Sequence, residues 1–298
     1  MIKKAVIPAA GFGTRLLPAT KSQPKEMLPV VDKPTIQYVV EEAVASGITD
    51  ILMIIGKGKR AIEEHFDRSF ELEMALEEKG KTEMLEAIRN ITNLADIHFV
   101  WQKELNGLGD AIRYARHHVG NEPFAILLGD SIMESYDGNP VTKQLMEMYD
   151  THQASVVALE AVDPSLVYRY GVMGGEELEN NRYKVREFVE KPDPADAPSN
   201  LVIAGRYIFT PEIFSYLEKI PRGVNNELQL TDAMQMMLKE HDMYALNFNG
   251  QRHDIGNKLD FIKTNLLFGL QREEMAEELS SWIQSLAESL KSKAVVVE

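Results

Sequence analysis

Short apolar runs rich in β-branched residues recur along most of the chain, and helical patterns lie between the early ones. The runs cover residues 5–7, 51–55, 97–101, 124–128, 155–159, 201–209 and 244–248. Apolar residues at helical spacing follow Pro34 and stop before Gly47, which predicts a helix over residues 34–46, and another helix begins near Gly109. Strands that alternate with helices predict an α/β fold with a mostly parallel central sheet flanked by helices. Ligands are then expected at the carboxyl ends of the strands.

The pattern changes near Lys258, where the chain becomes almost wholly helical. An apolar stripe on the last helical segment comprises Leu279, Trp282, Ile283, Leu286 and Leu290. We predict a catalytic domain over residues 1–265 and a helical C-terminal extension over residues 266–298, which packs on that domain or lies at a subunit interface. The proline-rich, acidic segment 191–200 lies between strand patterns, so we expect a loop within the first domain.

Composition narrows the possible partners. With 298 residues, 44% of them hydrophobic, the chain can bury a substantial core. The net charge of −14 and the pI near 5.1 argue against a nucleic acid or a membrane surface as partner, because both require a basic face. The absence of cysteine excludes disulfides, thiolate metal sites and cysteine nucleophiles. No apolar stretch approaches the roughly 20 residues of a membrane span, and no signal-peptide pattern is present, so we expect a cytoplasmic location.

The first strand pattern leads directly into a glycine-containing loop with several positive charges, residues 8–28. Gly11 and Gly13 allow the backbone to approach an anion closely, and Arg15, Lys21 and Lys25 supply charge for more than one phosphate. The first 33 residues hold six Lys or Arg and only two acids, against the acidic balance of the whole chain. This loop predicts a nucleotide site.

Two common nucleotide motifs do not match the loop. A dinucleotide fingerprint needs a third glycine where Leu16 stands, and several prolines interrupt an early helix. No Gly-Lys-Ser/Thr follows at the spacing of a P-loop. The phosphates are therefore expected on a long extended loop, in a protein that is neither a dehydrogenase nor a P-loop enzyme.

Acidic residues that could hold a metal ion lie at two places. Asp130 ends the apolar run FAILLGD, so its carboxylate is expected at the same sheet edge as the glycine loop. Asp254, in RHDIGNK, is the best second candidate. Mg²⁺ is typically held by one or two carboxylates together with phosphate oxygens and water. The alternatives are a turn aspartate at position 130 and a helix cap at position 254.

Glu190 and Lys191 stand side by side where another apolar run finishes. Glu190 could accept hydrogen bonds from sugar hydroxyl groups while Lys191 neutralises a second phosphate, although a solvated strand end is an alternative. A phosphate loop, metal-binding acids and a separate lysine fit transfer between two phosphorylated substrates, which depends on in-line positioning and charge neutralisation. Together they predict a nucleotidyltransferase.

A set of motifs resembles the bacterial UTP–glucose-1-phosphate uridylyltransferases over nearly the whole chain. In order, these motifs are GFGTRLLPATKSQPKEMLPVVDKPTIQYV, QKELNGLGDA, LLGD, YGV, FVEKP, APSNL, GRYIF, ELQLTDA and HDIGNKL. The resemblance implies a GT-A-like, Rossmann-like nucleotidyltransferase fold, assembled as a homodimer or higher homo-oligomer. It also implies a Mg²⁺-dependent enzyme that forms UDP-glucose and pyrophosphate from UTP and glucose 1-phosphate.

The resemblance also assigns roles to individual residues. Contacts to the nucleotide are implied for Ala10, Gly11, Gly13, Thr14, Glu26, Gln102 and Gly107. Arg15 and Lys25 become the catalytic residues, and Asp130 and Asp254 the metal ligands. Glucose 1-phosphate would contact Gly171, Glu190 and Lys191. The chemistry of Gln102 agrees, because an amide offers both a donor and an acceptor to a pyrimidine edge.

Two positions depart from the family pattern. Ser131 stands where many members have a second aspartate, and the serine would weaken a ribose or metal-water contact. Asp110 stands where many members have a histidine, and it adds negative charge near the nucleotide. A glucose-1-phosphate thymidylyltransferase stays an alternative, because thymine differs from uracil by one methyl group, worth about 1–3 kcal/mol in a pocket. A catalytically silent nucleotide-sugar-binding protein is the second alternative.

Overall fold

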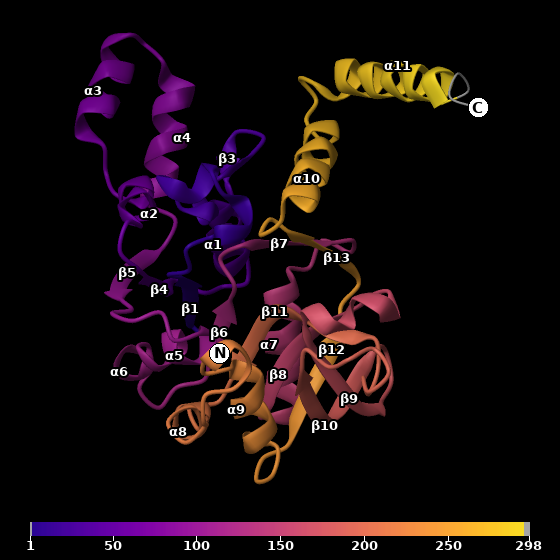
Figure 1. Ribbon diagram of the computed structural model, residues 1–298. Coiled ribbons are helices and arrows are strands. Elements are labelled where there is room, and N and C mark those ends of the chain that lie inside the picture. Colours follow the sequence, from indigo (N-terminus) through magenta and orange to yellow (C-terminus); the bar gives the residue numbers. More distant parts are fainter. Residues whose placement is uncertain (1, 295–298) are drawn as a thin grey trace.

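A nine-stranded sheet forms the centre of the structure, a computed structural model that describes residues 2–294 (Figure 1). Across the sheet the strands are β5 (Asp96–Trp101), β4 (Asp50–Ile55), β1 (Lys4–Ala9), β6 (Phe124–Leu127), β11 (Leu201–Phe209), β8 (Ser155–Ala161), β12 (Met243–Asn247), β10 (Arg182–Glu190) and β9 (Gly171–Glu177). Strands β11 and β10 run antiparallel to all their neighbours, and the remaining pairings are parallel. Seven of the nine strands therefore share one direction, as the prediction of a mostly parallel sheet requires, and two are reversed.

All seven predicted strand segments belong to this sheet. The prediction missed the β9–β10 hairpin, because neither strand is a continuous apolar run: in β10 only Val185 and Phe188 are buried. It also missed two small antiparallel sheets. These consist of β7 (Ser131–Ser135) with β13 (Gly250–Asp254), and β2 (Pro29–Val30) with β3 (Lys33–Pro34).

Helices cover both faces of the central sheet. Apolar side chains of β1 alternate between them: Val6 belongs to one hydrophobic cluster and Ile7 to the other. The helices packed on the Val6 side are α5 (Leu108–Arg113), α6 (Arg116–Val119), α8 (Ile213–Leu217) and α9 (Leu230–Met237). Those on the Ile7 side are α1 (Thr35–Ala45), α2 (Arg60–Phe66), α4 (Thr82–Thr92) and α7 (Val141–His152).

Helix α1 confirms the predicted helix of residues 34–46. Pro34 caps its start, and the chain turns out of it at Gly47, whose φ of +89° favours glycine. Helices α3 (Phe70–Glu78) and α4 form an arm that projects from the body (Figure 1). Short 3₁₀ turns complete the structure at Thr14–Leu16, Ala19–Lys21, Lys25–Met27, Pro164–Arg169 and Val224–Asn226.

The C-terminal region is helical, as predicted, and consists of α10 (Lys258–Leu270) and α11 (Ala276–Ala294). Helix α10 begins at a cap in which Asn257 Oδ1 accepts a hydrogen bond from the Asp260 N–H at 2.9 Å, and Phe268 packs edge-on against Tyr38 of α1. Helix α11 leads away from the body (Figure 1). Because α10 spans position 265, the division at that residue stays a prediction, and residues 295–298 of the extension lie outside the described part. Within residues 2–294, no helix has the length and apolarity needed to cross a bilayer.

Candidate active site

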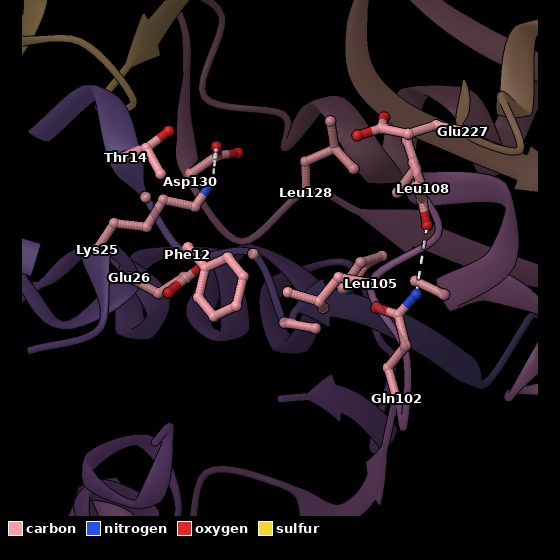
Figure 2. A pocket seen from close by; sticks show the side chains of 16 residues that line it. Phe12, Thr14, Lys25, Glu26, Gln102, Leu105, Leu108, Leu128, Asp130 and Glu227 are labelled. Atoms are coloured by element: carbon pink, nitrogen blue, oxygen red, sulfur yellow. Dashed lines mark hydrogen bonds and ion pairs between the residues drawn. The ribbon is translucent and has the colours of Figure 1, made fainter. Parts of the chain in front are cut away.

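A pocket of about 440 Å³ opens beyond the carboxyl ends of β1 and β5 (Figure 2). Nine of the predicted site residues line it: Ala10, Gly11, Gly13, Thr14, Lys25, Glu26, Gln102, Gly107 and Asp130. They come from the glycine loop, the segment after β5 and the end of the run that contains β6. The structure thus brings together residues more than a hundred positions apart in the sequence.

The glycine loop folds back on itself through three short 3₁₀ turns. Gly13 has φ +67°, and a Cβ placed there would lie 3.1 Å from Cβ of Lys25, so the two ends of the loop are in close contact. Thr20 Oγ1 donates to the Gly13 carbonyl at 2.8 Å and secures the turn. The prolines that interrupt an early helix therefore let the chain return Lys25 and Glu26 to the pocket. Lys21 is exposed and lines neither this pocket nor the one described below.

Lys25 and Asp130 form an ion pair, with 2.5 Å between Nζ and Oδ2. Burial lowers the pKa of Lys25, but the carboxylates of Asp130 and Glu26 outweigh it and raise that pKa overall. Burial raises the pKa of Asp130, but Lys25 and Arg15 outweigh it and lower that pKa overall. Both groups are therefore charged at neutral pH, as phosphate and metal binding require.

Glu26 is held by a lysine that the sequence reasoning missed. Lys59 Nζ lies 2.8 Å from Glu26 Oε2, and both side chains are buried. Burial raises the pKa of Glu26, with the two neighbouring lysines Lys25 and Lys59 acting against it. One signal could have pointed to Lys59, namely its place after Gly58 in the segment that follows β4.

Gln102 lies at the end of β5, where its backbone N–H donates to the carbonyl of Ile55 on the neighbouring strand at 2.9 Å. Its side-chain Nε2 donates to Asp110 Oδ2 at 2.9 Å and to the Gly107 carbonyl at 3.4 Å. The negative charge expected from Asp110 is therefore engaged by the amide of Gln102.

A second pocket, of about 260 Å³, shares Leu108, Leu128 and Asp130 with the first. The other predicted site residues line it: Arg15, Gly171, Glu190, Lys191 and Asp254. Of the residues predicted for the site, all except Lys21 therefore line one of two pockets that meet at Asp130. This arrangement suits two phosphorylated substrates whose reacting groups meet between the pockets.

Glu190 ends β10, and Lys191 begins the loop that follows it. Thr231 Oγ1 donates to Glu190 Oε2 at 2.7 Å, and Lys191 Nζ lies 3.2 Å from Glu190 Oε1. Lys191 has a φ of +48°, a left-handed backbone conformation that is uncommon for a non-glycine residue. Thr231 was missed, although it lies in the ELQLTDA motif, and so was Arg252, which pairs with Glu160 and lies over the ring of Tyr170.

The β7–β13 pairing brings the two candidate metal ligands to one place. Asp254 pairs with Ser131, directly after Asp130, and the Ile255 N–H donates to the Asp130 carbonyl at 3.1 Å. Two carboxylates beside an open pocket fit Mg²⁺, which takes its other ligands from phosphate oxygens and water. Within the described residues, no group of three or more His, Cys, Asp or Glu could hold a metal ion. Arg15 lies close by, since a Cβ on Gly256 would be 2.6 Å from its guanidinium nitrogen.

Ser131, where the family pattern has an aspartate, is buried and faces an arginine. Arg206 is fully buried, donates to Ser131 Oγ at 3.3 Å and to the Ser131 carbonyl at 2.9 Å, and pairs with Glu42 at 2.8 Å. Arg206 thereby fixes the backbone directly after Asp130.

The family model of the nucleotidyl transferases matches residues 4–268, which include both pockets. The chain belongs to the nucleotidyl transferase family. Among its curated relatives, the UTP–glucose-1-phosphate uridylyltransferase of Staphylococcus haemolyticus is 55% identical over 96% of this chain and 98% of that protein. The enzyme of the same name from Bacillus subtilis is 52% identical over 96% of this chain and 97% of that protein. The family resemblance stated from the motifs is therefore confirmed.

Solved structures agree with this nucleotidyl transferase assignment. A UDP-glucose pyrophosphorylase complexed with UDP-glucose is 44% identical, covers 91% of this chain and 100% of its own, and gives a TM-score of 0.85. A UTP-bound enzyme of the same kind from Acinetobacter baumannii is 39% identical, covers 96% and 100% of the two chains, and gives a TM-score of 0.89. A putative glucose-1-phosphate thymidylyltransferase from Bacillus anthracis is less similar, at 26% identity and a TM-score of 0.69. The comparison favours the uridylyl reaction over the thymidylyl alternative.

Proposed function

We propose that this chain forms UDP-glucose and pyrophosphate from UTP and glucose 1-phosphate. The observation that carries this proposal is the meeting of two pockets at Asp130, one lined by the glycine loop and the other by Glu190 and Lys191. The identities of 55% and 52% to the curated uridylyltransferases support the same reaction. The thymidylyltransferase and the silent binding protein are not favoured.

Ala10, Gly11, Gly13, Thr14, Glu26, Gln102 and Gly107 bind UTP in this proposal, and all of them line the first pocket. Gly171, Glu190 and Lys191 bind glucose 1-phosphate in the second. A phosphate oxygen of glucose 1-phosphate attacks the α-phosphorus of UTP in line. The new P–O bond forms as the bond to the β-phosphate bridging oxygen breaks, and pyrophosphate leaves with that electron pair. Arg15 and Lys25 neutralise the charge that spreads over the transferring group.

A divalent metal ion is in keeping with the family, and we propose that it is Mg²⁺, held by Asp130 and Asp254. When bound, the ion supplies positive charge to the phosphate oxygens. Lys25 Nζ contacts Asp130 Oδ2 at 2.5 Å, so the lysine and the metal ligand act on the same phosphate region.

We also propose a cytoplasmic homodimer or higher homo-oligomer, with residues 1–265 as the catalytic domain and residues 266–298 as a helical extension. The apolar stripe of α11 supports a subunit contact, because Trp282, Leu286 and Leu290 are 54%, 41% and 59% exposed in the single chain.

A nucleotide panel tests the proposed reaction. Pyrophosphate release and nucleotide-sugar formation are measured with glucose 1-phosphate and, in turn, UTP, dTTP, CTP and ATP. We expect the highest kcat/KM with UTP, and UDP-glucose as its product. Equal turnover with dTTP and UTP would contradict the uridylyl assignment, whereas no turnover with any nucleotide would favour a silent binding protein.

A further inference from the structure

Among the residues that the structure describes, hydrogen-bond acceptors lie at only one end of the Gln102 side-chain amide. The acceptors at that end are the Asp110 carboxylate at 2.9 Å and the Gly107 carbonyl at 3.4 Å. An ionised carboxylate and a backbone carbonyl can only accept, so the end of the amide that faces them must be its NH₂ group. Turning the amide by half a rotation would place Oε1 against both oxygens and lose both bonds. The surroundings therefore determine the orientation of this amide.

The amide oxygen of Gln102 is left to face the pocket. No donor among the described residues bonds to Oε1. Every fully enclosed side-chain nitrogen or oxygen of those residues has a hydrogen-bond partner, so Oε1 is not enclosed. Oε1 is therefore open to the pocket that Gln102 lines, although the residue as a whole is only 6% exposed. In Figure 2 the amide nitrogen of Gln102 points along its dashed hydrogen bond, while the oxygen is turned to the other side.

We propose that Asp110 is a positioning residue that fixes the Gln102 amide with its oxygen toward the nucleotide pocket, and thereby selects bases with a ring N–H on their pairing edge. The inference rests on the proposed role of Gln102 at the base. Arg113 supports the arrangement, because its guanidinium Nη1 lies 3.4 Å from the other Asp110 oxygen, Oδ1, and holds that side chain in place.

This arrangement distinguishes the two common pyrimidines. Uracil carries an N–H at ring position 3, which can donate to Oε1. Cytosine has an unprotonated nitrogen there, which would oppose its lone pair to the same oxygen. A site built to accept a hydrogen bond rejects an analogue that lacks the donor, because a buried polar group is then left unpaired.

The test measures kcat/KM for UTP and for CTP at fixed glucose 1-phosphate. Asp110→Leu removes the acceptor at similar volume and frees the amide to turn, so the UTP-to-CTP ratio should fall at least ~10-fold, with KM for glucose 1-phosphate unchanged. In a Gln102→Met background, Asp110→Leu should change the ratio by less than ~2-fold, because no amide remains to be oriented. The proposal is overturned if Asp110→Leu lowers kcat/KM equally for UTP and CTP. It is also overturned if Asp110→Leu lowers the UTP-to-CTP ratio further in the Gln102→Met background.

A paired exchange keeps the test decisive if Asp110→Leu does not fold. Gln102→Glu alone places a second carboxylate against that of Asp110, and the repulsion should lower kcat/KM for UTP. Adding Asp110→Asn supplies a donor to the new carboxylate, whose other oxygen still faces the pocket. We expect the double variant to exceed Gln102→Glu at least ~10-fold in kcat/KM for UTP, and a double variant no better than the single one contradicts the proposal.

The outcome also separates this inference from the proposed reaction. If Gln102→Met keeps the wild-type ratio, Gln102 does not read the base and the inference fails. UDP-glucose formation by the wild-type chain would still support the proposed reaction in that case.

Discussion

The buried ion pair between Lys59 and Glu26 joins the phosphate loop to the segment between β4 and α2. The two charged atoms are 2.8 Å apart, and the side chains are 6% and 1% exposed. Removing one member of such a pair leaves the other charge buried and unpaired, which is far more costly than replacing both by apolar residues.

Lys59→Met should therefore lower the free energy of unfolding by about 3–5 kcal/mol. Adding Glu26→Leu should recover most of that loss, because neither charge of the Lys59–Glu26 pair then remains. Urea denaturation of the wild type and both variants measures the effect, with Lys57→Met as an exposed control in the same segment. A loss below about 1 kcal/mol in Lys59→Met would show that the pair is not buried as described.

All residues predicted for the site except Lys21 line one of the two pockets, because they lie in loops where the residue types themselves indicate the chemistry. Lys59, Thr231 and Arg206 were not predicted. Each acts through a partner distant in sequence, as Arg206 does with Glu42, and such pairs follow from three-dimensional packing rather than from local spacing.

Among the elements, the α3–α4 arm is joined by one carboxylate, Glu73 in the first turn of α3, which pairs with Arg89 in the last turn of α4. Arg68 contacts Glu73 through Nε at 2.8 Å and through Nη2 at 3.0 Å, and Arg89 Nε donates to it at 3.0 Å. Hydrogen bonds from Arg68 and then Arg89 lower the pKa of Glu73 to about 2. Since the folded pKa lies below the unfolded value, this contribution to stability is full above about pH 4.5 and is lost as the pH falls through about 2.

Side-chain ¹³C NMR of Glu73 should therefore show a titration midpoint near 2. Arg89→Gln removes one of the donors and should move the midpoint upward, toward the ordinary value of about 4.3. A wild-type midpoint already near 4.3 would contradict the described geometry.

The strands show which elements a sequence can predict. Buried strands such as β6 and β8 are continuous apolar runs and were found directly. The β9–β10 hairpin was missed, because β9 contains three glycines and β10 is only partly buried. The reversal of β11 was also not predicted, because the direction of a strand depends on the path of the chain rather than on its residue pattern.

For the whole molecule, the exposed stripe of α11 bears on the oligomeric state. We expect Trp282→Glu together with Leu286→Glu to dissociate the proposed homo-oligomer, because two charges would enter an apolar contact. Light scattering after size-exclusion chromatography measures the mass. Glu277→Lys, a charge change near the start of the same helix, is the control. An unchanged oligomer after the double substitution would remove α11 from the interface.

In the proposed reaction, the uridylyl group is transferred in the pocket formed by the glycine loop and the Lys25–Asp130 pair. The initial rate of UDP-glucose formation from UTP and glucose 1-phosphate tests it most directly, in the wild type, Lys25→Ala and Lys21→Ala. Lys21 is the matched control, since it belongs to the same loop but is exposed and lines neither pocket. We predict a loss of at least ~10²-fold for Lys25→Ala and little change for Lys21→Ala. Near-full activity of a folded Lys25→Ala variant would show that Lys25 does not stabilise the transferring group.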